Sequence, residues 1–189
     1  MELNNKLIGH NKLFNQLVEL YDKNILPNKI LLSGKKGIGK FTLASHFLNY
    51  IFSQKEDFIY DLKNFTINKD NKSFQFFKKN IHPNIFLIKK NKDKKYIEIS
   101  QIREMLKFQN RSSFNNKLKF VIIDDVSYLN LSSSNALLKS IEEPNNNAFY
   151  ILTHNSNSYL LDTIKSRCIE FKMLLNISNN KLIVQDYFN

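Results

Sequence analysis

At 189 residues, with 42% hydrophobic and 24% charged residues, the chain has the size and composition of one ordinary globular domain, which argues against a disordered protein. Its single cysteine, Cys168, excludes an internal disulfide framework and a zinc site built from thiolates. The formal net charge of +11 fits a nucleic-acid partner, because Lys and Arg neutralise phosphates, but it equally fits a solvated surface rich in lysine.

The sequence also argues against a membrane or secreted protein. The wholly apolar runs, such as Val121–Ile123, are far shorter than the roughly 18 residues that a membrane-spanning helix needs. Residues 1–5 lack the basic start and the apolar stretch of a signal peptide. We therefore expect a cytoplasmic protein without a membrane partner.

Short apolar runs separated by helical patterns predict an α/β fold, with a parallel five-stranded sheet and helices on both faces. The expected strands are Lys29–Ser33, Ile85–Ile88, Lys119–Ile123, Phe149–Thr153 and Ile169–Phe171. Residues 53–82 mix Lys, Asn and Phe without a clear period, and we interpret them as an irregular insertion. We expect one domain over residues 1–171, followed by residues 172–189 as a separate tail.

A glycine-rich turn joins the first expected strand to a helix. It reads Gly34-Lys35-Lys36-Gly37-Ile38-Gly39-Lys40, and the helix after it has one apolar face made of Phe41, Ala44, Phe47, Leu48, Ile51 and Phe52. Such a turn points backbone N–H groups and the positive end of the helix dipole at one spot, so it can hold a polyphosphate that Lys40 also reaches. A glycine-rich turn that binds nothing is the alternative.

The residue after Lys40 bears on metal binding. In P-loop proteins this position supplies a hydroxyl group to Mg²⁺, but Phe41 has none and Thr42 comes one position too late. We therefore expect weak ATP binding at most, and Phe41 argues against Mg²⁺. Phe41 also belongs to the apolar face of the helix, so a role in packing is a reasonable alternative for this residue.

The third expected strand ends in two carboxylates, Asp124 and Asp125, at the edge where α/β sheets bind ligands. Asp124 would hold a metal ion through water. Asp125 stands where an active P-loop ATPase with this pair of acidic residues usually has Glu, whose side chain is one methylene longer. Because a general base must lie within about 2.6–3.2 Å of the proton it takes, Asp125 predicts weak or absent hydrolysis. Two aspartates that merely cap a loop are the alternative.

Three further features follow along the chain. Thr153 ends the fourth expected strand, where it could sense a γ-phosphate or be an ordinary strand-end residue. A helix is expected over Ser133–Glu142, because it follows serines suited to N-capping and stops before Pro144. Ser166–Cys168 comes directly before the last expected strand.

Taken in order, four segments closely resemble the clamp-loader ATPases, a family of AAA+ P-loop proteins, and within them the delta-prime branch of bacterial DNA polymerase III. The segments are Gly34–Thr42, Lys119–Asp125, Asn135–Pro144 and Ser166–Cys168. The likeness covers about residues 4–172. Asn135–Pro144 is its most diagnostic part, because a generic P-loop enzyme does not need it.

The resemblance implies a function for Arg167. In this family the arginine of Ser-Arg-Cys reaches the nucleotide on the neighbouring subunit, so Arg167 is expected to act in trans as an arginine finger. The implied protein is a weakly hydrolysing or non-hydrolysing subunit that supports the loading of a sliding clamp onto primed DNA. Its implied partners are the motor subunits, the delta subunit, and, through the complex, the clamp and the DNA.

The chain departs from the family pattern in residues 53–82 and in residues 172–189. Many relatives carry a four-cysteine zinc module after the P-loop helix, but residues 53–82 contain no cysteine, so zinc is not expected. Relatives also continue into a lid and a collar, whereas residues 172–189 would be the start of a truncated lid or a C-terminal tail.

Two other functions stay open. One is a self-sufficient AAA+ ATPase, such as a gamma- or tau-like motor subunit of a clamp loader. Phe41 and Asp125 argue against it, because a motor should keep the hydroxyl group and the glutamate. The other is a plain DNA-binding module that uses the net charge of +11, which leaves the ordered motifs unexplained.

Overall fold

The chain folds as two compact units, and each is described by itself. The computed structural model describes residues 4–111, 118–142 and 148–174. Of these, residues 4–26, 37–79 and 173–174 form what we call the helical unit, and the others, within 27–36 and 80–172, form the sheet unit. The expected tail 172–189 is described only as far as Leu174, and the motif Asn135–Pro144 only as far as Glu142.

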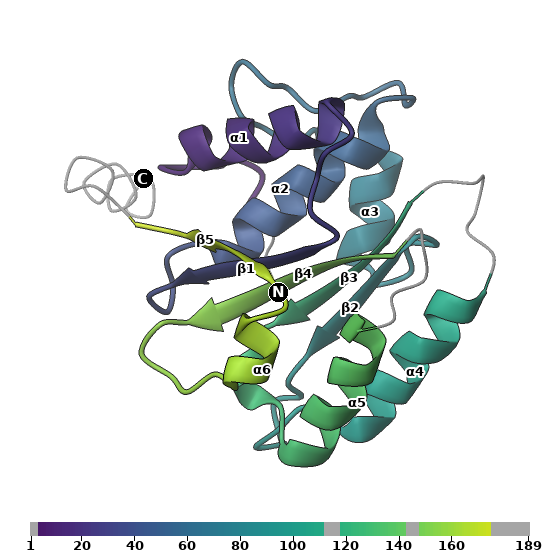
Figure 1. Ribbon diagram of the computed structural model, residues 1–189. Helices are drawn as coiled ribbons and strands as arrows, with labels where there is room; N and C mark the ends of the chain where they lie inside the picture. The colour runs from purple at the N-terminus through teal and green to yellow at the C-terminus, as the bar shows by residue number, and fades with distance from the viewer. Residues whose placement is uncertain (1–3, 112–117, 143–147, 175–189) are drawn as a thin grey trace. The chain divides into compact units, whose positions relative to one another are not determined.

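The sheet unit is built on five parallel strands, which Figure 1 labels. They are β1 (Lys29–Gly34), β2 (Ile85–Lys89), β3 (Lys119–Asp124), β4 (Ala148–Asn155) and β5 (Ile169–Lys172). Their order is β2-β3-β4-β1-β5, so β4 lies between β1 and β3. The predicted five-stranded parallel sheet is confirmed. Because parallel strands share a carboxyl edge, the ends of β1, β4 and β3 lie side by side.

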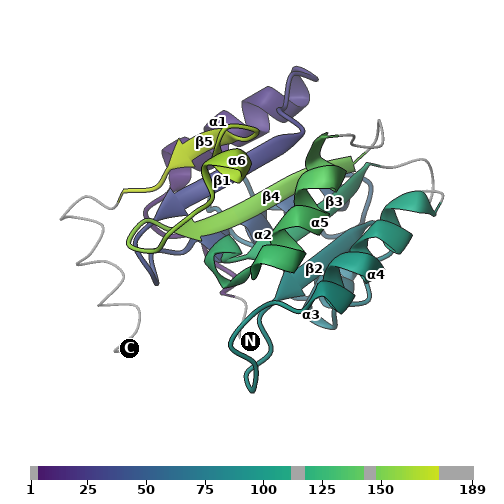
Figure 2. The same ribbon diagram turned by 60° about the horizontal axis from the view of Figure 1, so that its bottom comes forward.

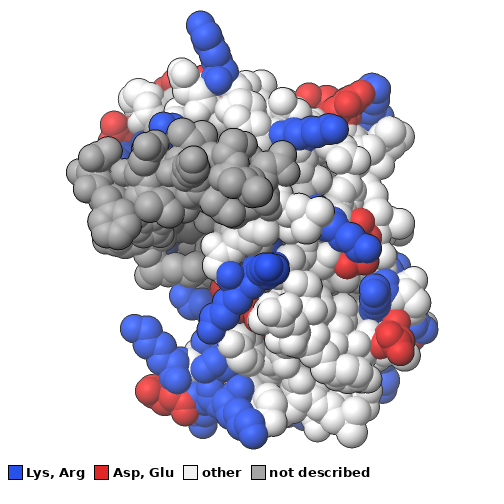
Figure 3. Space-filling view, turned by 90° about the vertical axis from the view of Figure 1, so that its left-hand side faces the viewer, with Lys and Arg blue, Asp and Glu red and all other residues white. Residues whose placement is uncertain are grey.

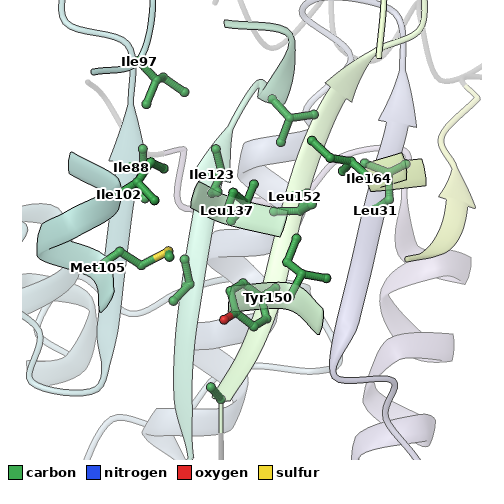
Figure 4. Packing of buried hydrophobic residues seen from close by; sticks show 14 residues of the cluster. Leu31, Ile88, Ile97, Ile102, Met105, Ile123, Leu137, Tyr150, Leu152 and Ile164 are labelled. Carbon is green, nitrogen blue, oxygen red and sulfur yellow. The ribbon is translucent and has the colours of Figure 1, made fainter. Parts of the chain in front are cut away.

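Three helices of the sheet unit, α4 (Ile99–Asn110), α5 (Leu131–Glu142) and α6 (Asp162–Lys165), lie along one face of its sheet (Figures 1 and 2). Figure 4 shows the apolar core between these helices and the strands. It includes Leu31, Ile88, Ile123 and Leu152 from the strands and Ile102, Met105, Leu137 and Ile164 from the helices. Burial of each such side chain stabilises the fold by about 1.5–3 kcal/mol, so this core is a main source of the stability of the sheet unit.

The start of α5 corrects one detail of the sequence analysis. The helix begins at Leu131, two residues before the expected start at Ser133. The side-chain oxygen of Asn130 accepts a hydrogen bond from the backbone N–H of Ser133 at 2.9 Å, so Asn130 and not a serine caps the helix. Asparagine is at least as good an N-cap as serine, which explains the earlier start.

The helical unit consists of α1 (Asn11–Asp22), α2 (Lys40–Ser53), α3 (Lys72–Lys78) and the segment between α2 and α3. The sequence analysis did not predict α3, whose N-terminus is capped by the Asn71 side chain. The expected insertion also supplies Tyr60 and Phe65, whose rings pack against Phe14 of α1 with centroids 5.1 and 5.8 Å apart. The insertion is therefore part of the core of this unit.

The face shown in Figure 3 carries side chains of both charges. On the face shown in Figure 3, lysine and arginine side chains stand among acidic side chains, including a group of both signs at the lower left. On this face, the lysine and arginine side chains are therefore not gathered in one purely positive stripe. Within the described residues, no helix is both long and apolar enough to cross a membrane.

Candidate nucleotide site and Arg167

The glycine-rich turn has the backbone that a phosphate site requires. It runs from Gly34, which ends β1, to Lys40, which begins the 14-residue helix α2. Gly37 has φ +80° and Gly39 has φ +95°, conformations that only glycine adopts without strain. A Cβ atom at Gly37 would meet nothing within 4 Å, so the space beside this residue is open. The turn therefore fits a phosphate group at a helix N-terminus.

A histidine that the sequence analysis missed holds the turn in place. Nε2 of His10 lies 2.7 Å from the carbonyl oxygen of Ile38, to which an Nε2–H donates. The ring is buried, and burial lowers the pKa of His10 below its usual 6.5. Since His10 lies 28 residues before Ile38, no local pattern could have revealed the contact.

Phe41 is used for packing. Its side chain is only 8% exposed, and its ring stacks on that of Phe77 in α3, with centroids 6.1 Å apart and planes at 23°. Thr42, the next residue, is half-buried, and its carbonyl oxygen accepts a hydrogen bond from Ser45 Oγ at 2.8 Å. Lys40 is buried at the start of α2. The position that would supply a hydroxyl group to Mg²⁺ thus carries an aromatic ring fixed in the core.

Asp124, Asp125 and Thr153 lie together in the sheet unit. The backbone N–H of Asp125 donates to Thr153 Oγ1 at 2.8 Å, and the Thr153 hydroxyl donates to Asp124 Oδ1 at 3.2 Å. Thr153 is fully buried. Its hydroxyl group therefore ties the end of β3 to the neighbouring strand β4.

The Asp125 carboxylate is turned back toward its own loop. Its Oδ1 accepts hydrogen bonds from Ser127 Oγ at 2.6 Å and from the Ser127 backbone N–H at 3.2 Å. The backbone of Asp125 has φ +63°, the left-handed region that non-glycine residues rarely adopt. Asp125 thus caps the short helix η2 (Val126–Tyr128), as in the second interpretation above. The spacing of Asp125 and Ser127 is that of an Asx-turn, a signal that the sequence contains.

Arg167 is exposed, but its side chain is held at two points. Nη2 lies 2.6 Å from Glu142 Oε1, at the end of α5, and Nη1 donates to the carbonyl oxygen of Thr163 in α6 at 2.9 Å. The neighbouring Cys168 packs against the core cluster, and burial raises the pKa of its thiol to about 11. Cys168 therefore acts as a small apolar anchor beside an outward-facing arginine.

The residues present fit a phosphate group better than a metal ion. The backbone at Gly37 and Gly39 suits a polyphosphate, but the ring of Phe41 offers no ligand to Mg²⁺. In the described part of the chain, no group of three or more His, Cys, Asp or Glu side chains is placed to hold a metal ion.

The parallel sheet with β4 between β1 and β3, the glycine-rich turn and the carboxylates that end β3 define a P-loop domain of the AAA+ class. A family model described as DNA polymerase III, delta subunit, matches residues 9–176. The chain belongs to this family, which confirms the resemblance inferred from its motifs.

The chain is similar to several named proteins. It is 31% identical over 140 residues to DNA polymerase III subunit delta' of Pseudomonas aeruginosa, which covers 74% of this chain and 41% of that protein. It is 35% identical over 92 residues to DNA polymerase III subunit gamma of a Buchnera aphidicola strain, which covers 49% of this chain and 24% of that protein. The chain thus spans less than half the length of these relatives.

Among solved structures, a DNA polymerase III, gamma subunit-related protein of Thermotoga maritima has the same fold. The TM-score is 0.63 at 21% identity, over 91% of this chain and 49% of that one. At this level of identity, the likeness shows the fold alone.

Proposed function

We propose that the chain is a delta-prime-like clamp-loader subunit with little or no ATPase activity of its own, which supports sliding-clamp loading onto primed DNA. The observation that carries this proposal is the stacking of Phe41 on Phe77 in a P-loop whose glycines are otherwise in place. The turn keeps the backbone of a nucleotide site and has lost the metal ligand. Such a chain contributes its fold and its surface to a complex, and a neighbour performs the hydrolysis.

The nucleotide site of this chain is proposed to be weak. Backbone N–H groups from Gly34 to Lys40 would hold the phosphates of ATP, in the absence of a Mg²⁺ ligand at Phe41. Asp125 would be a poor base, because its carboxylate already accepts two hydrogen bonds from Ser127. The roles of Asp124 in metal binding and of Thr153 in sensing a γ-phosphate stay proposals drawn from the family resemblance.

Arg167 is proposed to act on the nucleotide of a neighbouring motor subunit. A planar guanidinium group is always charged and presents a fork of donors to phosphate oxygens, so it stabilises the charge that develops during phosphoryl transfer. Arg167 is suited to this role because it is exposed between the end of α6 and the start of β5. The proposed partners are the motor subunits and the delta subunit, with the clamp and primed DNA reached through the complex. This work would take place in the cytoplasm.

Two measurements test the proposal. The purified full natural chain should show little Mg²⁺-dependent ATP turnover. Robust turnover that is abolished in Lys40→Ala would refute the proposal that the chain has little ATPase activity of its own. In the reconstituted loader, Arg167→Ala should slow the neighbour's ATP turnover about ten-fold or more, since arginine fingers contribute up to about 10³–10⁵ in rate. Arg103→Ala removes an exposed arginine of α4 and is the matched control. Equal rates in Arg167→Ala and Arg103→Ala would remove the finger assignment.

The second candidate is an active motor subunit. The 35% identity with a gamma subunit over 92 residues favours it. Phe41 and the orientation of Asp125 oppose it, because a motor subunit needs a metal-bound nucleotide and an available base. The ATPase assay on the isolated chain separates the two candidates directly.

A further inference from the structure

The contact between Arg167 and Glu142 joins two motifs that lie far apart in the sequence. Glu142 is the last residue of α5, in the segment Asn135–Pro144, and Arg167 belongs to Ser166–Cys168. Their side chains meet at 2.6 Å between Nη2 and Oε1, the short distance of a charge-assisted hydrogen bond. The last residue of α5, the helix that carries the most diagnostic motif, therefore contacts the proposed arginine finger.

A second contact makes the arrangement directional. Nη1 of Arg167 donates to the Thr163 carbonyl oxygen at 2.9 Å, while Nη2 is bound by Glu142. Two contacts at different nitrogens fix the position of the Nη1–Nη2 edge of the guanidinium group and the direction in which this edge lies. A guanidinium group has five N–H donors, so the donors that these contacts do not use remain to meet the oxygens of a phosphate group.

We propose that Glu142 is a positioning residue for Arg167: it holds the guanidinium group in the orientation from which it meets the phosphates of a neighbouring subunit's nucleotide. This inference rests on the proposed function. A long arginine side chain has many rotamers, and an arginine that is already ordered loses less freedom when it binds. Glu142 acts through Arg167 and does not itself touch the nucleotide.

The exposure of the ion pair between Arg167 and Glu142 suits a contact that orients the arginine but still lets it move to a phosphate group. The side chains of Arg167 and Glu142 are 36% and 47% exposed, and ion pairs in such positions are weak. A nucleotide phosphate carries more charge than one carboxylate, so it can draw the guanidinium group forward when the neighbour arrives. A fully buried pair would instead hold the arginine back.

The test uses the full natural chain in the reconstituted loader, with Mg²⁺-ATP turnover by the neighbouring subunit as the readout. Glu142→Ala should lower that turnover about three- to ten-fold, the range expected for a coupling between two contacting residues. Glu142→Gln keeps an oxygen that can accept from Nη2 and should retain most of the rate. In the Arg167→Ala background, Glu142→Ala should have no further effect. Glu104→Ala removes an exposed carboxylate from α4 and serves as the control.

The outcomes separate this inference from the proposed function. No effect of Arg167→Ala would overturn the finger assignment, and the positioning role with it. If Arg167→Ala lowers the neighbour's ATP turnover while Glu142→Ala leaves it unchanged or raises it, the positioning role alone is overturned. A loss in Glu142→Ala that persists unchanged in the Arg167→Ala background, or that Glu142→Gln does not rescue, would also overturn it. Melting temperatures of the variants show whether each assembles from folded chains.

Discussion

Thr153 Oγ1 accepts a hydrogen bond from the backbone N–H of Asp125 at 2.8 Å, so a single buried hydroxyl group fixes the backbone just after β3. The register of the sheet makes this contact possible, because Ile123 of β3 pairs with Leu152 of β4, two residues before Asp125 and one residue before Thr153. The turn at Asp125 is therefore determined by the sheet as well as by its own side chain.

This contact predicts a stability effect at Thr153. Replacing Thr153 by Val should lower the free energy of unfolding by about 1–3 kcal/mol, because the Asp125 N–H then loses its buried acceptor. Thr153→Ser keeps the hydroxyl group and is the control. Urea denaturation followed by circular dichroism measures both. Equal stability of the two variants would show that the hydrogen bond is dispensable.

A change at Phe41 should restore a metal ligand. Phe41→Thr places a hydroxyl group directly after Lys40, so ATP binding should become tighter in the presence of Mg²⁺ by several-fold. The same change removes the stacking on Phe77, and we expect a loss of about 2–4 kcal/mol in stability. Phe41→Leu is the control, because it weakens the packing without adding a ligand. Titration with ATP, with and without Mg²⁺, decides: a similar Mg²⁺ dependence in both variants contradicts the prediction.

The buried His46 predicts a loss of stability in acid. Its Nδ1 lies 2.9 Å from the Tyr60 hydroxyl group and its Nε2 lies 3.0 Å from the Asn4 carbonyl oxygen, an arrangement that suits a neutral ring. Burial lowers the pKa of His46 from 6.5 to about 4. Between these values the folded state binds fewer protons than the unfolded state, so the free energy of unfolding falls as the pH is lowered through this window.

The expected slope from His46 is at most about 1.4 kcal/mol per pH unit. His10, whose pKa burial also lowers, adds to it in the same direction. Urea denaturation at several pH values between 4 and 6.5 measures the slope. His46→Gln cannot take up a proton and should flatten it; a variant with the full slope would show that other groups cause the acid sensitivity.

Tyr150 carries a polar network inside the core of the sheet unit. Its hydroxyl group donates to the Ser140 carbonyl oxygen at 3.0 Å and accepts from Gln109 Nε2 at 2.5 Å. Tyr150→Phe leaves both partners buried without this contact, so we expect a loss of about 1–3 kcal/mol in the free energy of unfolding. Phe149→Leu, on the half-buried neighbouring residue, is the comparison. A Tyr150→Phe chain as stable as the wild type would contradict the prediction.

The sheet could be predicted well from the sequence because most of its strands contain a continuous run of apolar residues. Lys119–Ile123 and Phe149–Thr153 both lie within observed strands. The short helix α3 was missed because its seven residues are too few for a periodic pattern to emerge from a lysine- and phenylalanine-rich segment. The start of α5 was misplaced by two residues because Asn130 competes with several serines as a cap.

The site was only partly predictable. The turn from Gly34 to Lys40 and the pair Asp124 and Asp125 are contiguous, so their pattern is local. By contrast, the contacts of Ile38 with His10 and of Arg167 with Glu142 join residues from different elements. Such side-chain contacts depend on how the elements pack, which no local pattern encodes.

The left-handed backbone at Asp125 makes this position unsuited to a longer acidic side chain. An aspartate can bend back to accept from the N–H two residues ahead, whereas a glutamate is one methylene longer and would leave that turn. Asp125→Glu would therefore lose the contact that stabilises a strained residue before it supplied a base. An Asp125→Glu chain is therefore expected to be less stable than the wild type, and the position after Lys40 would still carry Phe41, which offers no metal ligand.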